Sequence, residues 1–275
     1  AAFTTAMSGY QETMTDPSYL GQHIIFSTSH VGNYEGNREV MQSDRSHATC
    51  LIARNFSYND FLADTDVPLF SGVDTRSLVK YLTTTETAHK SVITASPESP
   101  SAEAFKNETL ICEELERVGQ REVQTHIEGD RPIALINYGC KQAIIQRLIS
   151  LGLPLVSFPH TVKAEELAKW QPRMIFLSNG PGDPRRLNEE ITEVKKMLEL
   201  QIPMRGICLG HQLLSLALGA ENFKLPFGQR GINHPVQDHH SGQILITSQN
   251  HGYATEEESF LQVAKPENNP TGREF

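Results

Sequence analysis

From residue 133 onward, apolar runs alternate with segments whose apolar residues recur at helical spacing. Ile133–Asn137 (IALIN) is the apolar run expected of a strand buried on both faces of a parallel sheet. In Lys141–Leu151 apolar residues return every three or four positions, which predicts a helix with one buried face. Further strands and helices are predicted at Leu155–Phe158, Ala164–Trp170, Met174–Leu177, Ile191–Leu200 and Ile202–Met204. Four strand–helix units with short connections predict an open, mainly parallel α/β sheet with helices on both faces.

The first 120 residues are patterned less regularly and predict a mixed α/β region. Gln22–Thr28 alternates like a strand, and Cys50–Arg54 is a second short strand. Asp74–Leu82 begins with an Asp/Thr cap and continues with apolar residues at helical spacing, which predicts a helix.

A change of composition separates the two regions. Ala95–Ser101 is rich in serine and proline and is typical of a turn, and a charged segment follows it. We therefore predict a first domain at 1–120, a linker at 121–131 and a second domain at 132–275.

Composition excludes several classes of function. The chain has 275 residues, of which 38% are hydrophobic and 21% charged, as in an ordinary globular protein. Its formal charge of −9 argues against a nucleic-acid or anionic-membrane surface. No apolar run reaches the roughly 18 residues of a membrane span, and the first residues are not a signal peptide. The sequence does not begin with methionine, and its first residues already lie inside a patterned segment. We therefore expect the start of the chain to be missing.

The four cysteines are scattered, without a C-x-x-C pair: Cys50, Cys112, Cys140 and Cys208. This spacing supports neither a disulfide framework nor a zinc site, so we expect reduced thiols and a cytoplasmic protein.

The candidate chemistry centres on Gly206–Ile207–Cys208–Leu209–Gly210–His211–Gln212, between the strand ending at Met204 and an apolar helix predicted at Gln212–Ala220. A cysteine with glycines two positions before and after it, at a strand-to-helix turn, is typical of a nucleophile elbow. The glycines remove Cβ atoms that would clash, and the helix start favours a thiolate. On this segment alone, a buried cysteine beside a tight turn remains the alternative.

A second glycine-rich segment, Asn179–Gly180–Pro181–Gly182, follows the strand Met174–Leu177. It matches neither a phosphate-binding loop nor a dinucleotide fingerprint. Its alternatives are a simple Gly-Pro turn or an oxyanion hole made of backbone N–H groups. Ligands of open parallel sheets bind at the carboxyl ends of strands, where both this loop and Cys208 are expected.

Three other polar features are candidates for a catalytic, metal-binding or ligand-binding role. His211 lies about one helical turn beyond Cys208, where a structural hydrogen bond is favoured over a role as base. Asp238–His239–His240 is interpreted as a solvated turn, because no matching ligands suggest a metal. Gln249–Asn250–His251–Gly252–Tyr253 suits recognition of a small polar ligand, although its spacing alone favours a surface turn.

Together these segments resemble a known family. Leu177–Pro184 (LSNGPGDP) and Gly206–Gln212 closely resemble the class I (triad) glutamine amidotransferases. The first region is similar to the small subunit of carbamoyl-phosphate synthase in Met7–Glu12, Thr15–Tyr19, His30–Asn33 and Asp74–Arg76. Gly228–Val236 and Gln249–Tyr253 fit the same family, and the resemblance runs from about Phe3 to about Phe260. The resemblance of the first region disfavours the alternative that this chain is the amidotransferase domain of another synthase.

The resemblance implies that the Cys208 thiolate attacks the side-chain carboxamide of glutamine and forms a γ-glutamyl thioester. The N–H groups of Gly182 and Leu209 would form the oxyanion hole. The residues that would hold the glutamine are Gly180, Gly182, Leu209, Gln212, Asn250, Gly252 and Tyr253. The ammonia would pass to a separate large subunit that binds ATP and Mg²⁺ and makes carbamoyl phosphate for arginine or pyrimidine biosynthesis. The first domain would dock on that subunit, and no cofactor or metal is implied in this chain.

Two departures from the family bear on activity. Ala6 stands where the family has a serine near the glutamine, so one hydroxyl contact is lost. The family's catalytic His and Glu belong to a His-Pro-Glu motif, which the 275 residues do not contain, and Gln262–Phe275 already leaves the family pattern. We therefore expect a truncated chain without its general base and orienting acid, and with little glutaminase turnover. Two functions stay open: an amidotransferase subunit that needs a further C-terminal segment, or an inactive glutamine-binding or docking protein.

Overall fold

The fold is that of a computed structural model, which describes residues 1–84, 90–94 and 114–264. The chain divides into two compact units, whose described residues lie within 1–94 and 225–252 for the first unit and within 114–224 and 253–264 for the second. Each unit has its own sheet and its own buried core. The predicted turn at Ala95–Ser101, Cys112 and the end of Gln262–Phe275 lie outside the described residues.

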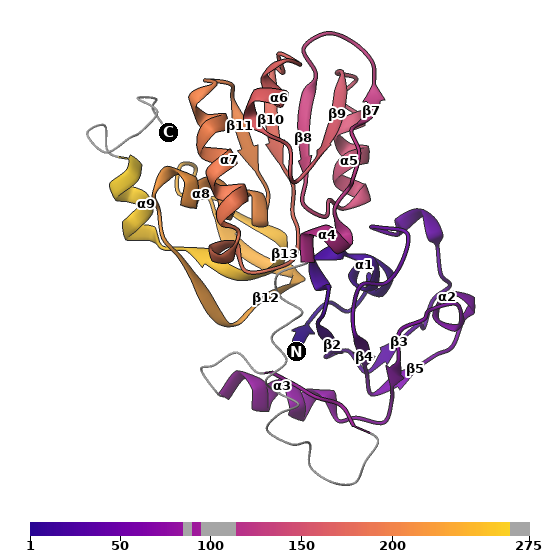
Figure 1. The fold of residues 1–275 in the computed structure, drawn as a ribbon. Coiled ribbons are helices and arrows are strands. Elements are labelled where there is room, and N and C mark those ends of the chain that lie inside the picture. The colour runs from indigo at the N-terminus through magenta and orange to yellow at the C-terminus, as the bar shows by residue number, and fades with distance from the viewer. Residues whose placement is uncertain (85–89, 95–113, 265–275) are drawn as a thin grey trace. The chain divides into compact units, whose positions relative to one another are not determined.

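The second unit is built on a five-stranded sheet with helices on both faces (Figure 1). Its strands are β7 (Gln124–Ile127), β8 (Ile133–Asn137), β9 (Leu155–Pro159), β10 (Met174–Leu177) and β11 (Met204–Gly206). Its helices are α4 (Glu114–Val118), α5 (Gln142–Ile149), α6 (Ala164–Ala168), α7 (Asn188–Glu199), α8 (Leu209–Leu218) and α9 (Glu257–Ala264).

The strand order is β11-β10-β8-β9-β7, and β8 to β11 are mutually parallel. This confirms the open, mainly parallel sheet predicted from the apolar runs. β7 pairs antiparallel with β9 and lies at the edge, within the segment 121–131 that we predicted as a linker. An edge strand is covered less completely than a central one, so Gln124–Ile127 lacks the apolar run by which the other strands were recognised.

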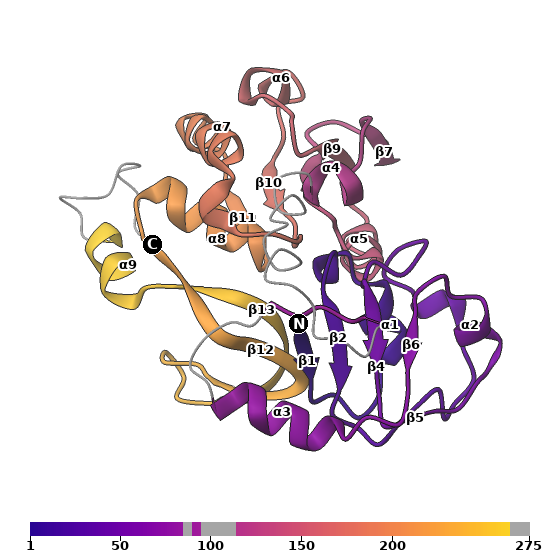
Figure 2. The ribbon, with the colours of Figure 1, turned by 60° about the horizontal axis from the view of Figure 1, so that its bottom comes forward.

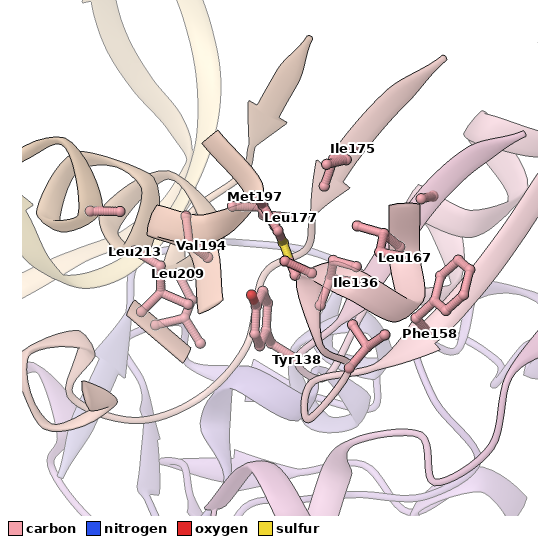
Figure 3. Close-up of a cluster of buried hydrophobic side chains, with 14 of the residues drawn as sticks. Ile136, Tyr138, Phe158, Leu167, Ile175, Leu177, Val194, Met197, Leu209 and Leu213 are labelled. Carbon is pink, nitrogen blue, oxygen red and sulfur yellow. The ribbon is translucent and has the colours of Figure 1, made fainter. Parts of the chain in front are cut away.

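Alternate residues of β8 face two separate cores. Ala134 and Ile136 pack in the cluster that contains Leu167, Val194 and Leu213 of α6, α7 and α8 (Figure 3). Ile133 and Leu135 pack with Ile145 and Leu148 of α5 on the opposite face. Because side chains alternate along a strand, a strand covered on both faces must be apolar at every position.

Two helices begin earlier than predicted. α8 starts at Leu209, directly after Cys208, and ends before Gly219, whose φ of 103° only glycine adopts easily. α7 starts at Asn188 rather than Ile191, because its first turn carries Glu189 and Glu190. Acidic residues favour a helix N-terminus but give no apolar periodicity.

The first unit contains a parallel sheet of order β1-β2-β4-β6, whose strands lie side by side in Figure 2. Its elements are β1 (Ala2–Thr4), α1 (Tyr10–Thr15), β2 (His23–Phe26), β3 (His30–Val31), β4 (Cys50–Ile52), β5 (Asn55–Phe56), α2 (Asp60–Ala63), β6 (Leu69–Phe70) and α3 (Thr75–Thr84). α1 packs on one face of the sheet through Tyr10 and Met14, and α3 packs on the other through Leu78. The strands predicted at Gln22–Thr28 and Cys50–Arg54 are confirmed.

A long two-stranded ribbon, β12 (Asn222–Gln237) and β13 (Ile244–Thr255), corrects the expectation for Gln249–Tyr253. Gln249–Tyr253 lies within β13 and is not a surface turn, because pairing with β12 continues the strand past its polar residues. Residues 225–252 group with the first unit, whereas the predicted division placed everything from 132 on in one domain. The predicted turn at Asp238–His240 is confirmed, with Asp238 accepting from the His240 N–H at 2.9 Å.

None of the helices within the described part of the chain is both long and apolar enough to cross a membrane.

Candidate active site at the end of β11

Cys208 lies between β11 and α8 in a backbone conformation that only a constrained turn maintains. Its φ of 52° and ψ of −111° place a non-glycine residue in a sparsely populated region, and it forms the N-cap of α8. Its side chain is half-buried, whereas Cys50 and Cys140 are buried. The strand–cysteine–helix turn predicted from the sequence is confirmed, and the α8 dipole favours a thiolate there.

The two glycines of the elbow are required by close backbone contacts. A Cβ on Gly206 would lie 2.5 Å from the Gly210 carbonyl carbon and from the His211 nitrogen. A Cβ on Gly210 would lie 2.5 Å from the Leu177 carbonyl carbon and 2.6 Å from its Cβ. These neighbours are backbone or buried atoms with no room to shift, so the predicted reason for both glycines holds.

Backbone hydrogen bonds fasten the elbow to the end of β10. The Ile207 N–H donates to the Leu177 carbonyl at 3.0 Å, and the Gly210 N–H donates to the Ser178 carbonyl at 2.9 Å. The fully buried Ser178 hydroxyl accepts from the Tyr138 N–H at 2.9 Å. The ends of β8, β10 and β11 are thus joined where the strand order reverses, which is the binding position in open α/β sheets.

The Asn179–Gly182 loop is fixed beside the elbow. The Asn179 side chain donates to the Gly139 carbonyl and accepts from the Lys141 N–H, both at 3.1 Å. A Cβ on Gly180 would lie 2.8 Å from Cδ2 of Leu209, so the loop and the first residue of α8 are in contact. Because Leu209 begins the helix, its N–H has no acceptor one turn earlier and can serve a ligand.

Tyr253, at the end of β13, connects several parts of this unit. Its carbonyl accepts from Nε2 of Gln212 at 2.8 Å. The Lys224 Nζ lies 3.1 Å from the Tyr253 hydroxyl and 4.4 Å from its ring centroid, and the Arg185 guanidinium lies 5.3 Å from that centroid. Burial, followed by the negative charge of Asp183, raises the pKa of Tyr253 to about 12, so its hydroxyl stays protonated at neutral pH.

The acidic end of the glycine loop is neutralised locally. Asp183 accepts from the Arg185 guanidinium at 2.7 and 3.0 Å and from the Arg185 N–H at 3.0 Å. These hydrogen bonds outweigh the effect of burial, which opposes them, and they hold the pKa of Asp183 below its usual range. The negative charge beside the loop is therefore paired at neutral pH.

The remaining predicted glutamine contacts belong to the first unit. Asn250 donates through Nδ2 to the Asp16 carboxylate at 2.7 Å, and Asp16 is 1% exposed. Asp16 was not among the residues predicted for the site, although its segment Thr15–Tyr19 carries part of the family resemblance. Gly252 lies next to the Arg230 guanidinium, and the Ala6 N–H donates to the Thr4 hydroxyl at 3.2 Å.

One His-x-Glu spacing does occur in the chain, at His126 and Glu128, without the proline of the family motif. His126 lies on β7, with Nε2 2.9 Å from the Ser157 hydroxyl. Since β7 and β11 are at opposite edges of the five-stranded sheet, four strand spacings of about 4.8 Å separate them. His126 is therefore too far from Cys208 to take its proton directly. His211 Nε2 lies 3.5 Å from the Thr255 hydroxyl, consistent with the structural role expected for it.

Within the described ranges, no group of three or more His, Cys, Asp or Glu side chains is arranged to hold a metal ion.

Replacing Ser178 by alanine is expected to lower the free energy of unfolding by about 1–3 kcal/mol, because the buried Tyr138 N–H would lose its acceptor. Urea denaturation measures this loss. Ser150→Ala is the matched control, because the Ser150 hydroxyl donates to the Arg147 carbonyl at an exposed helix end, and it should change stability by less than about 0.5 kcal/mol. Equal losses in the two variants would contradict the role assigned to Ser178.

Comparison with known proteins agrees with the fold and the elbow. The family model described as "Glutamine amidotransferase class-I" matches residues 134–271, which contain most of β8, all of β9, β10 and β11, the glycine loop and Cys208. A second model, "Carbamoyl-phosphate synthase small chain, CPSase domain", matches residues 1–93.

Three similar proteins share this combination. The carbamoyl phosphate synthase small chain of Bacillus thuringiensis is 37% identical over 268 residues, covering 94% of this chain and 73% of that protein. The small chain of Clostridium perfringens is 39% identical, covering 91% and 75%. The arginine-specific small chain of Bacillus subtilis is 37% identical, covering 94% and 74%. The chain belongs to the carbamoyl-phosphate synthase small-chain family.

Proposed function

We propose that this chain hydrolyses glutamine through a thioester on Cys208 and supplies the ammonia to a large, ATP-dependent carbamoyl-phosphate synthase subunit. One observation carries the proposal. Cys208 adopts a strained backbone conformation at the start of α8, between two glycines whose positions admit no Cβ. Such strain is maintained where it exposes a nucleophile, and a buried structural cysteine has no need of it.

The proposed reaction has two steps. The Cys208 thiolate adds to the side-chain carbonyl carbon of glutamine, and the carbonyl oxygen becomes an oxyanion. When this intermediate collapses, the carbon–nitrogen bond breaks, the nitrogen takes up a proton and ammonia leaves. Water then attacks the thioester carbonyl, which releases glutamate and restores the thiol.

The remaining roles follow the same proposal. The N–H groups of Gly182 and Leu209 stabilise the oxyanion, a contribution of about 2.7–4 kcal/mol for each donor of this kind. Gly180, Gln212 and Tyr253 bind the glutamine. Asn250 and Gly252 stay predicted glutamine contacts, and the proposal assigns no general base to the described residues.

The partner follows from the family. In this proposal the chain binds a large subunit that consumes the ammonia. That subunit holds ATP and Mg²⁺, and this chain holds no cofactor. The first unit, which matches the small-chain model, provides the docking surface. The arginine-specific name of the Bacillus subtilis relative supports a role in arginine biosynthesis. The proposal places this reaction in the cytoplasm.

The deciding experiment incubates the purified chain with L-glutamine and measures both the intact mass and the ammonia released. We expect a mass increase of one γ-glutamyl group that hydroxylamine removes. Glutamine binding by calorimetry without any thioester would instead support the inactive glutamine-binding alternative. Glutamine-dependent carbamoyl phosphate synthesis after addition of a large subunit tests the partnership.

A further inference from the structure

Glu114, the first residue of α4, lies against the glycine of the proposed oxyanion hole. Its Oε2 atom is 2.5 Å from the position that a Cβ on Gly182 would occupy. Gly182 has a φ of 100°, a backbone conformation that residues with side chains rarely adopt. The Glu114 carboxyl therefore fills the space beside the Gly182 peptide.

The same carboxyl oxygen is buried and has no hydrogen-bond partner among the described residues. An ionised carboxylate in such a place loses its hydration without replacement, which costs free energy. The ionisable groups that act on Glu114 come from α4, the loop after β10, β12 and β13: Arg117, Asp183, Arg186, Lys224 and Tyr253. Burial is the largest influence and outweighs the three cations, so the pKa of Glu114 rises to about 7.

We propose that Glu114 is a positioning residue for the Gly182 peptide, and that its charge controls how well this peptide stabilises the oxyanion formed during glutamine hydrolysis. The inference rests on the proposed function. A neutral carboxyl packs against Gly182 and leaves the N–H available to the oxyanion. An ionised carboxylate attracts that N–H and opposes the negative charge that develops on the substrate oxygen.

Raising the pH through about 7 ionises Glu114 and should slow thioester formation, although it increases the thiolate fraction of Cys208. The two effects separate when the rate of thioester formation from glutamine is divided by the rate of Cys208 alkylation by iodoacetamide. Alkylation needs the thiolate but no oxyanion hole.

The test compares this rate ratio between pH 6 and pH 8 in the wild-type chain, Glu114→Gln and Glu116→Gln. In the wild type we expect the ratio to fall about tenfold. In Glu114→Gln, which keeps the shape but cannot ionise, the ratio should stay constant. Glu116 lies on the same helix and is exposed, so Glu116→Gln should follow the wild type.

Each outcome decides the matter. A constant ratio in the wild type overturns the inference without any variant, and so does a wild-type fall that persists in Glu114→Gln. If iodoacetamide labels Cys208 but glutamine forms no thioester at any pH, the proposed function fails and the inference fails with it. A thioester whose rate ratio ignores Glu114 leaves the proposed function standing and removes only the inference.

Discussion

Replacing Cys208 by serine is expected to lower thioester formation from glutamine by at least about 10³-fold and to remove the low ammonia release expected of this chain. A serine hydroxyl at this position stays protonated at neutral pH, whereas the thiol at the start of α8 is favoured as a thiolate. Losses of this size are typical when a covalent nucleophile is removed. Intact mass and ammonia release after incubation with L-glutamine measure the two effects.

Cys50→Ala is the matched control for this prediction, because Cys50 is a buried cysteine of β4 in the other unit. It should retain thioester formation and lose only some stability through the small cavity it leaves. Cys208→Ser should unfold at the same denaturant concentration as the wild type. Undiminished ammonia release from a folded Cys208→Ser chain would refute the assignment of the nucleophile.

Replacing Gly210 by alanine is expected to destabilise the second unit by about 3 kcal/mol or more. Helix propensity alone predicts the opposite, a gain of about 1 kcal/mol for alanine over glycine inside a helix. The steric effect decides, because the new Cβ would lie 2.5 Å from the Leu177 carbonyl carbon, a fully buried backbone atom. The Gly210 N–H bond to Ser178 would lengthen as the helix moves away. Urea denaturation measures the loss.

Gly152→Ala provides the comparison for Gly210→Ala. Gly152 has a φ of 66° but no atom within 4 Å of the position of a new Cβ. Its replacement should therefore cost only the backbone strain, about 1–2 kcal/mol. If Gly210→Ala is as stable as the wild type, then Gly210 is not required by the contact with Leu177, and the interpretation of the elbow fails.

The second unit was predicted well because its physical constraints act locally along the chain. A strand covered on both faces must be apolar throughout, so β8 and β10 were visible in Ile133–Asn137 and Met174–Leu177. β7 and β12 were missed because an edge strand or an isolated ribbon carries mixed residues and depends on its pairing partner. No local pattern marks such a strand.

The candidate site was likewise predicted only where its constraints act locally along the chain. Glycine spacing around Cys208 predicted the elbow, since a turn with no room for a Cβ restricts its own sequence. Glu114 gave no signal, because its burial against Gly182 arises from residues 68 positions apart in the sequence. Asp16 and Asn250 are separated even further, and only folding brings their side chains to 2.7 Å.

By itself, the sequence determined the parallel sheet, the nucleophile turn and the family, because each depends on residues that are neighbours in the chain or on motifs read along it. Only the tertiary structure decided which groups surround the elbow. The contacts of Tyr253 with Lys224 and Arg185, the distance of His126 from β11, and the carboxyl beside Gly182 all depend on how the strands are ordered and packed. Burial and the charges of nearby residues set the protonation of these groups, and the linear sequence records neither.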